Sequence, residues 1–309
     1  MLTVPLGQSE LKSTRLIYGC MRLPGTWNVA EIDDKRRREA FAALDAALAA
    51  GYNHFDHSDI YARGECERIF GDYLKANRSV REKIIITTKV GIRWPKDTGP
   101  DAPHRYDFSA AYIQSSCEGS LQRLGVDTID VYLLHRPDVL MNPDEVAGAF
   151  EKLKQQGKVR HFGVSNFTIS QTALLQSRMR DPLVCNQIEV HPLHLAPLED
   201  GTIDDLYQRR ITPTSWSPVA GGRLGDPPSA ASDAPVRVMN ALDAEAKSGG
   251  VSRTAVLLAW LLAHPAGILP IVGSRDPGRI RESVAADGVT LSREAWYRIY
   301  LAARGKPLP

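Results

Sequence analysis

The chain has 309 residues, of which 43% are hydrophobic, and its formal net charge at pH 7 is +2. A chain of this length can bury a large core without disulfides or structural metals. The small net charge gives no reason to expect a nucleic-acid surface or a polybasic membrane patch, and no apolar run approaches the roughly 20 residues that cross a bilayer. We therefore expect a cytoplasmic protein with no nucleic-acid or membrane partner.

Short β-branched runs alternate along the chain with amphipathic segments rich in alanine and leucine. Strands are expected, in chain order, at residues 15–18, 53–56, 84–89, 130–135, 159–164, 184–189, 212–216 and 268–272. Helices are expected at residues 35–50, 65–76, 109–124, 143–156, 168–177, 202–209, 235–247, 252–263, 277–286 and 292–303. The last of these helices follows the eighth strand and is an added C-terminal element.

Eight strand–helix units predict an α/β fold, a closed parallel (β/α)8 barrel of the TIM type, in a single domain over residues 1–309. We also expect a β-hairpin before the first barrel strand. An open doubly wound sheet is the rival fold, but it would be expected to carry a GxGxxG motif after an early strand, and the chain has none. Two long irregular loops, at residues 93–107 and 218–235, follow the third and seventh strands, where a barrel places lids and binding loops.

Three of the expected strands end in a polar residue. Asp56, Lys89 and His135 each close an apolar run, and Tyr61 follows Asp56 by five residues. The carboxyl ends of parallel barrel strands share one face, which is where barrel enzymes do chemistry. We therefore expect these four side chains to lie together.

The four residue types suit the protonation of an oxygen while hydride reaches the adjacent carbon. A tyrosine hydroxyl has an ordinary pKa near 10, and the ammonium of Lys89 would lower the pKa of Tyr61. Asp56 would keep Lys89 charged and oriented, and His135 would hydrogen-bond a substrate carbonyl oxygen.

Several motifs in this chain resemble those of the aldo-keto reductase family. FDHSDIY at residues 55–61 with the following Gly64-Glu65, TTKV at 87–90 and YLLH at 132–135 are similar to the segments that carry the family's catalytic residues. The resemblance continues in order through GVSNF at 163–167, NQIE at 186–189, SWSP at 215–218 and PIVGS at 270–274. It covers residues 12–290, and ordered motifs over most of a chain are far more specific than any single pattern.

The resemblance implies a monomeric, NADPH-dependent reductase of a small aldehyde or ketone, in which Tyr61 is the general acid. It places Ser165, Asn166 and Gln187 at the nicotinamide carboxamide and Trp216 against the nicotinamide ring. The Gly-rich segment after the seventh strand would hold the pyrophosphate through Ser217, Pro218, Gly221, Gly222, Arg223 and Leu224. The adenosine end would lie near Gly273, Ser274, Arg275, Arg279 and Glu282, and two arginines there favour a 2′-phosphate.

Substrate contacts are expected from Arg22, Trp27 and Trp94, which follow the first and third strands. Two other functions remain open. Lys89 could form a Schiff base in a barrel aldolase, or the barrel could bind NADPH as a sensor with weak catalysis.

The four cysteines, Cys20, Cys66, Cys117 and Cys185, are far apart and are expected to be reduced structural thiols. Two histidine pairs, 54/57 and 191/194, have HxxH spacing. No cysteine or carboxylate cluster accompanies either pair, so we expect no metal site.

Overall fold

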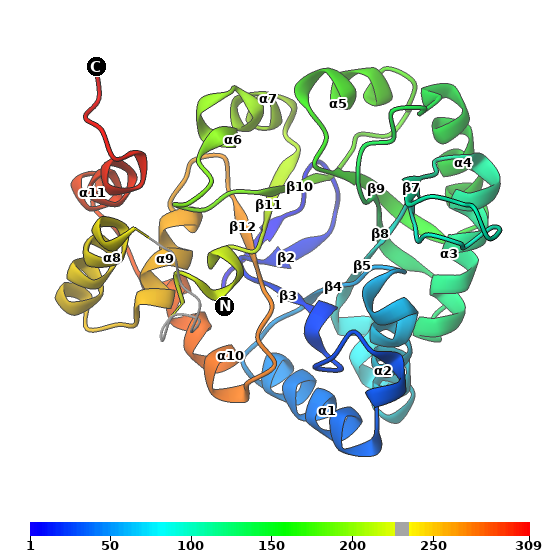
Figure 1. Cartoon of the computed structure of the whole chain (residues 1–309), viewed down its shortest axis with the longest axis horizontal. Helices are drawn as coiled ribbons and strands as arrows, with labels where there is room; N and C mark the ends of the chain where they lie inside the picture. The colour runs from blue at the N-terminus through cyan, green and yellow to red at the C-terminus, as the bar shows by residue number, and fades with distance from the viewer. Residues whose placement is uncertain (226–234) are drawn as a thin grey trace.

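The computed structural model describes residues 1–225 and 235–309. Within these residues, eight parallel strands form a closed barrel with helices around it (Figure 1). Around the ring, the strands are β3 (Ile17–Gly19), β4 (His54–Asp56), β5 (Ile85–Val90), β8 (Ile129–Leu134), β9 (Val159–Ser165), β10 (Cys185–Glu189), β11 (Thr212–Trp216) and β12 (Leu269–Val272). Pairing of β12 with β3 closes the ring. Each expected strand is present, and the predicted barrel is confirmed.

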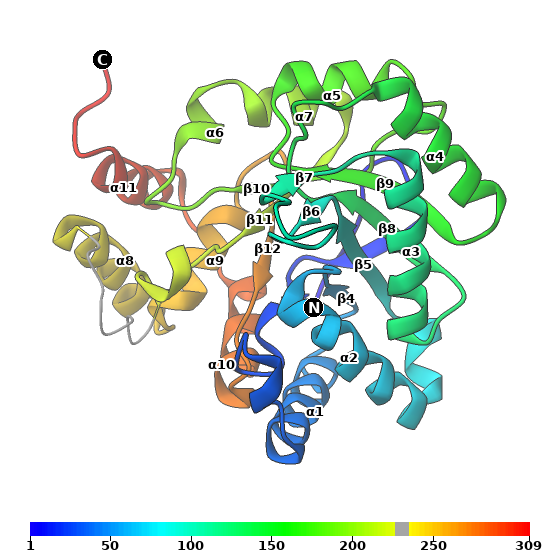
Figure 2. The same cartoon turned by 45° about the vertical axis from the view of Figure 1, so that its right-hand side comes forward.

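The helices also follow the expected order. They are α1 (Asp34–Ala49), α2 (Glu65–Ala76), α3 (Ala110–Leu124), α4 (Pro143–Gln155), α5 (Ile169–Gln176), α6 (Ala196–Glu199), α7 (Thr202–Arg209), α8 (Val236–Gly249), α9 (Arg253–Leu262), α10 (Pro277–Ser283) and α11 (Arg293–Arg304). The added helix α11 lies beside α8 on the outside of the barrel (Figures 1 and 2). In the described part of the chain, no helix is both long enough and apolar enough to cross a membrane.

Side-chain caps explain where several helices begin. Ser109, Thr168 and Ser252 each accept a hydrogen bond from a backbone N–H of the first turn that follows. Such caps satisfy backbone donors that have no partner inside the helix. Helix α10 is shorter than expected, because the chain continues after Ser283 as a 3-10 helix at Val284–Gly288.

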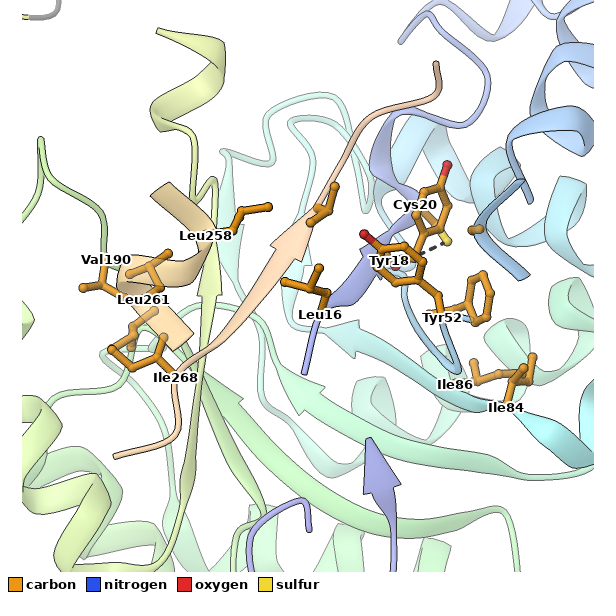
Figure 3. Packing of buried hydrophobic residues seen from close by; sticks show 14 of the residues in the cluster. Leu16, Tyr18, Cys20, Tyr52, Ile84, Ile86, Val190, Leu258, Leu261 and Ile268 are labelled. Atoms are coloured by element: carbon orange, nitrogen blue, oxygen red, sulfur yellow. Dashed lines mark hydrogen bonds between the residues drawn. The ribbon is translucent and has the colours of Figure 1, made fainter. Parts of the chain in front are cut away.

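The core has two layers, which follow from the alternation of side chains along each strand. Ile84 and Ile86 face outward into the layer between strands and helices, whereas Ile85 faces into the barrel. Figure 3 shows the outer layer, with Tyr18 and Tyr52 near β3 and Leu261 and Ile268 farther round the barrel. The inner layer joins apolar side chains of several strands: Ile17, Ile85, Val131, Leu133, Cys185, Leu269 and Ile271.

A β-hairpin covers the amino ends of the barrel strands, as predicted. Its strands β1 (Thr3–Pro5) and β2 (Lys12–Thr14) pair antiparallel, and Leu6 between them is fully buried in the inner layer. Gly7 adopts a φ of +55°, and a Cβ atom there would lie 2.5 Å from the carbonyl oxygen of Val184. Only glycine fits this close approach without strain. One end of the barrel is therefore sealed, and the opposite end remains for the site.

The long loop expected at 93–107 is present, and a short strand pair closes its base. Short strands β6 (Ile92–Arg93) and β7 (Arg105–Tyr106) pair antiparallel, and residues 94–104 between them form turns and irregular backbone. The guanidinium of Arg93 lies 3.7 Å from the ring centre of Tyr112 on α3, which anchors the hairpin to the barrel wall. Two-residue strands are too short to show an alternation in sequence. Of the other long loop, residues 226–234 lie outside the described residues.

Candidate active site

Lys89 is the centre of a buried polar cluster at the carboxyl ends of β4 and β5. Its Nζ donates to Asp56 Oδ2 at 2.7 Å, to the His57 carbonyl oxygen at 2.7 Å and to Tyr61 Oη at 3.0 Å. Lys89 has no exposed surface. A buried ammonium is tolerated only when its protons are matched by acceptors, and here each of the three has one.

Strand register brings Asp56 and Lys89 together. Asp56 pairs with Thr87 across β4 and β5, and Lys89 lies two residues farther on the same inward face. The chain after β4 then runs along β5, with His57 N–H donating to the Thr87 carbonyl at 2.7 Å. Tyr61 begins a tight turn in which Ala62 and Arg63 both adopt positive φ. This left-handed turn is costly for non-glycine residues, and it holds Tyr61 over Lys89.

The charge states in this cluster follow from burial and pairing. Burial disfavours the Lys89 ammonium, but Asp56 and Tyr61 together raise the pKa of Lys89 above its ordinary value. Burial raises the pKa of Tyr61 to about 12, and Lys89 only partly opposes that shift. Lys89 thus lowers the pKa of Tyr61 as expected, but the net shift is upward. The result is a protonated phenol in contact with a charged ammonium.

His135 stands beside Tyr61, immediately after β8. Its backbone N–H donates to the Val90 carbonyl at 2.8 Å, and its ring centre lies 5.9 Å from that of Tyr61. Nδ1 is 2.9 Å from Ser58 Oγ. Burial, Lys89 and Arg136 hold the pKa of His135 well below its ordinary value. The imidazole is therefore neutral, with Nε2 left as the nitrogen that can meet a ligand.

Gln187 belongs to this cluster, which the sequence did not indicate. Its Nε2 donates to Asp56 Oδ1 at 2.8 Å, so both carboxylate oxygens of Asp56 are bound. The expectation from the sequence placed Gln187 at a cofactor amide instead. The sequence contains no signal for the contact, because β4 and β10 lie across the barrel from one another and only the closed ring joins them.

A second polar group lies at the ends of β9 and β11. Asn166 Nδ2 donates to Ser165 Oγ at 2.7 Å, and Asn166 Oδ1 accepts from Trp216 Nε1 at 2.9 Å. Arg136 lies over the Trp216 ring, 5.2 Å from its centre. Asn166 has a φ of +59°, which lets the chain turn sharply after β9. The indole is thereby held by one edge and leaves an aromatic face at the mouth of the barrel.

The segment after β11 turns its backbone repeatedly. Ser217, Ala220, Gly221 and Gly222 all have positive φ, and a Cβ atom on Gly221 would meet no atom within 4 Å. Successive backbone N–H groups in such turns form anion-binding concavities. Pro218 and Leu224 are both buried, so neither side chain is available to a ligand. Arg223 Nε donates to the Ala220 carbonyl and braces the turn.

The segment from β12 to α10 brings the expected adenosine-site residues together. Arg275 rests on Gly25, and its guanidinium lies 3.3 Å from Glu39. The Arg275 atom in this ion pair is Nη1, which is itself buried, so the guanidinium is already matched by a carboxylate. Gly273 leaves open space beside Ser274, whose carbonyl accepts from Tyr18 Oη at 3.0 Å. Two further members of the expected set lie exposed on α10: Arg279 and Glu282.

These features fit a dinucleotide. An aromatic face, a glycine-containing turn and a guanidinium follow one another from β11 to α10, which matches a ring, a pyrophosphate and a phosphate in series.

The three expected substrate residues differ in position. Trp27 is 50% exposed, and its ring meets the Tyr61 ring edge-on with centres 6.4 Å apart. Trp94 lies at the start of the β6–β7 loop, with the guanidinium of Arg63 5.4 Å from its ring centre. Arg22 is exposed at the end of a 3-10 helix, Cys20–Arg22. Trp27 is thus the one of the three whose ring contacts a residue of the buried cluster.

The cysteines are buried and form no disulfide. Burial raises the pKa of all four thiols, which makes them poor nucleophiles. His54, from the first HxxH pair, hydrogen-bonds Ser13 and Thr87 through its two nitrogens. Across residues 1–225 and 235–309, no group of three or more histidine, cysteine or acidic side chains is arranged to hold a metal.

Comparison with known proteins identifies the family. The model of the Aldo/keto reductase family matches residues 15–302. The chain is 42% identical over 291 residues to a protein named 6-dehydroglucose reductase from Novosphingobium aromaticivorans, with 92% of each covered. It is 40% identical over 296 residues to the oxidoreductase YdhF of Escherichia coli K12, with 96% of this chain and 95% of YdhF covered.

A solved structure supports the same assignment. A thermostable aldo-keto reductase in complex with the inhibitor epalrestat has a TM-score of 0.83 and 26% identity, over 98% of this chain and 100% of that chain. The barrel, the cluster around Lys89 and the family match over nearly the whole length agree: the chain belongs to the aldo/keto reductase family and is an NAD(P)H-dependent oxidoreductase.

Proposed function

We propose that the protein reduces an aldehyde or ketone to an alcohol with NADPH, and that Tyr61 donates the proton to the carbonyl oxygen. The observation that carries this proposal is the Asp56–Lys89–Tyr61 chain of hydrogen bonds at 2.7 and 3.0 Å, buried at the open end of the barrel. A protonated phenol bonded to a fixed ammonium can release its proton to an oxygen that becomes basic, because the ammonium stabilises the phenolate left behind.

Each residue of the cluster has a part in the proposed reaction. NADPH, when bound, supplies the hydride. Tyr61 moves the proton from Oη, Lys89 stabilises the phenolate, and Asp56 with Gln187 holds Lys89 in place. Neutral His135 orients the carbonyl oxygen through Nε2.

The cofactor would be held by the second side of the barrel mouth. Trp216 would offer its ring to the nicotinamide, Ser165 and Asn166 lie at its edge, and Arg275 would turn from Glu39 to a 2′-phosphate. Arg279 adds an exposed guanidinium in the first turn of α10. Two guanidinium groups match the doubly charged phosphate that distinguishes NADPH from NADH.

The direct test is Tyr61→Phe, which removes only the phenolic oxygen. We expect NADPH to bind as tightly as before, because the ring and the backbone turn remain, and turnover to fall by orders of magnitude. Fluorescence titration with NADPH and steady-state oxidation of NADPH measure the two quantities. Tyr207→Phe, at an exposed position on α7, is the matched control and should change neither. Near-normal turnover in Tyr61→Phe would refute the proposed proton donor.

The two alternative functions are less well supported. A Schiff-base aldolase needs a neutral lysine, whereas Lys89 is paired with Asp56 and its pKa is raised. Borohydride in the presence of a carbonyl substrate should leave no adduct on Lys89. A sensor that binds NADPH with little catalysis would show tight binding and no NADPH consumption across a broad panel of carbonyl compounds.

For the substrate, we propose an oxidised sugar that carries an aldehyde, of the kind in the name of the 42% identical relative. Trp27 and Trp94 near the mouth support this, since aromatic faces pack well against the C–H faces of sugars. NADPH consumption with 6-dehydroglucose, compared with apolar aldehydes of similar size, tests the proposal. Equal or higher specificity, as kcat/KM, for the apolar aldehydes would contradict it.

A further inference from the structure

Behind His135 lies a chain of hydrogen bonds that leads away from the substrate side. Ser58 Oγ is 2.9 Å from His135 Nδ1 and 3.1 Å from Asp59 Oδ1. Ser58 is completely buried, whereas Asp59 is partly exposed. This chain of hydrogen bonds therefore joins the imidazole at the barrel mouth, through one buried hydroxyl, to the carboxyl group of a residue that reaches the surface.

A serine hydroxyl has a single proton, so the direction of this chain depends on the charge of Asp59. When Asp59 is protonated, it donates to Ser58, Ser58 donates to His135 Nδ1, and the ring proton of the neutral imidazole lies on Nε2. When Asp59 is ionised, Ser58 donates to Asp59, Nδ1–H donates to Ser58, and Nε2 is left with a lone pair. The second arrangement holds one proton fewer, and that proton goes to solvent.

We propose that Asp59, acting through Ser58, is a positioning residue that sets which nitrogen of His135 carries the proton. This inference rests on the proposed function of His135 at the carbonyl oxygen. With the proton on Nε2, His135 donates to a carbonyl oxygen and supports reduction. With the proton on Nδ1, Nε2 accepts from an alcohol O–H and supports the reverse oxidation.

The surroundings of Asp59 raise its pKa into the neutral range, where a change of pH can change the tautomer of His135. Partial burial and the carboxylate of Glu67 raise the pKa of Asp59 to about 7, and hydrogen bonds from Ser116 and Ser58 oppose the shift. Ser116 Oγ donates to Asp59 Oδ2 at 2.8 Å from α3. Glu67 on α2 is fully buried.

Groups on every neighbouring element face this carboxyl group. Arg123 on α3 pairs with Glu67 at 2.7 Å and weakens its effect, and Thr88 on β5 also donates to Glu67. Two tyrosines on adjacent elements interact electrostatically with Asp59: Tyr112 and Tyr132. Lys89 contributes its carbonyl to the backbone N–H of Asp59 at 3.3 Å. At neutral pH the phenols are uncharged, so Glu67 and Arg123 are the charges that tune Asp59.

The expected pH dependence has opposite signs in the two reaction directions. As pH rises through about 7, Asp59 loses its proton and the Nε2–H form of His135 declines. The kcat for carbonyl reduction should then fall, and the kcat for alcohol oxidation should rise, by about tenfold each, the factor that corresponds to one net hydrogen bond.

Three variants test the hydrogen-bond chain from Asp59 through Ser58 to His135. Asp59→Asn cannot ionise, and its amide donates to Ser58 as the protonated acid does, so reduction should stay high above neutral pH. Ser58→Ala disconnects Asp59 from His135. It should abolish the pH-dependent change of kcat near neutral pH in both reaction directions. Ser116→Ala is the matched control, because it removes a hydrogen bond that lowers the pKa of Asp59 but leaves the chain intact. Its pH profile should keep its shape and move to higher pH.

A measurement without substrate separates this inference from the proposed function. Nitrogen-15 NMR of histidine-labelled protein reports which ring nitrogen is protonated, and a His135→Gln variant identifies the signals. We expect the Nε2–H form at about pH 5.5 and the Nδ1–H form at about pH 8.5, and the Nε2–H form at both in Asp59→Asn. An unchanged tautomer in the native protein across this range would overturn the inference, whatever Tyr61→Phe shows. If the His135 tautomer changes with the protonation of Asp59, the proposed hydrogen-bond chain is confirmed even if Tyr61 proves not to be the proton donor.

Discussion

The two sides of the barrel mouth are built in opposite ways. On the β4–β5–β8 side, Lys89 is fully buried and every proton of its ammonium is bonded. On the β11–β12 side, the backbone of residues 217–222 turns through left-handed conformations, and Arg279 is exposed. One side is fixed by bonds between buried side chains, and the other presents a backbone turn and an exposed guanidinium.

The difference fits the two tasks of a cofactor-dependent reductase. Proton transfer gains most from groups already held in place in a site that excludes water, because no reorganisation is then needed at the moment of reaction. A cofactor must enter and leave in every turnover, so its site needs surfaces that open to solvent. The predictions below ask whether the two sides can be damaged separately.

The largest effect is expected for Lys89→Met. The substitution leaves Asp56 as a buried carboxylate without its cation, which should lower the free energy of unfolding by about 3–5 kcal/mol and reduce turnover by orders of magnitude. Chemical denaturation and steady-state kinetics measure the two losses. Lys154→Met, which removes an ion pair with Asp181 that is more than one-third exposed on both partners, should cost well under about 1 kcal/mol. Equal losses in the two variants would show that the Lys89 cluster is not a preorganised unit.

Next in size is the loss of cofactor preference in Arg275→Ala. We expect KM for NADPH to rise about tenfold with little change for NADH, because only the 2′-phosphate loses a charged hydrogen bond. Stability should change little on this side of the mouth. Arg281→Ala, an exposed arginine on the same helix, is the control. A native protein that prefers NADH would contradict the assignment of Arg275 and Arg279.

The smallest expected effect is a change in the free energy of unfolding. It distinguishes His57 from His54, two neighbouring histidines on the buried side of the barrel mouth. Both nitrogens of His57 are buried without a hydrogen bond, and its ring packs 4.5 Å from that of Phe70, centre to centre. His57→Leu should therefore raise the free energy of unfolding by about 1 kcal/mol. His54→Leu removes the partner of Ser13 and Thr87 and should lower it. Urea titrations at neutral pH compare the two.

The same pair gives a pH prediction. Burial lowers the pKa of His57 to about 3, whereas an unfolded histidine takes up a proton near its ordinary pKa of about 6.5. Since the unfolded chain binds this proton first, native stability should fall as pH drops from about 6.5 towards 3. His57→Leu should lose less stability over that range than the native protein. An identical pH dependence would show that His57 is not buried as a neutral ring.

Much of the fold was predictable because its periodicity is local. Side chains that alternate along β5 put Ile85, Thr87 and Lys89 on one face, and the helices expected from residues 109 and 252 begin with hydrogen bonds to Ser109 and Ser252 within one turn. The β6–β7 hairpin was not predictable, since two-residue strands form only when their partner is already near.

The candidate site divides in the same way. The sequence by itself determined that Asp56, Lys89 and His135 end strands, that Tyr61 follows at close range, and that the barrel gathers them on one face. Only the tertiary structure decided that Gln187 binds Asp56 from across the ring, that burial outweighs Lys89 in setting the pKa of Tyr61, and that Ser58 joins His135 to Asp59. Strand ends are set by neighbours in sequence, whereas hydrogen-bond partners and desolvation depend on groups far apart in the chain that meet only when the barrel closes.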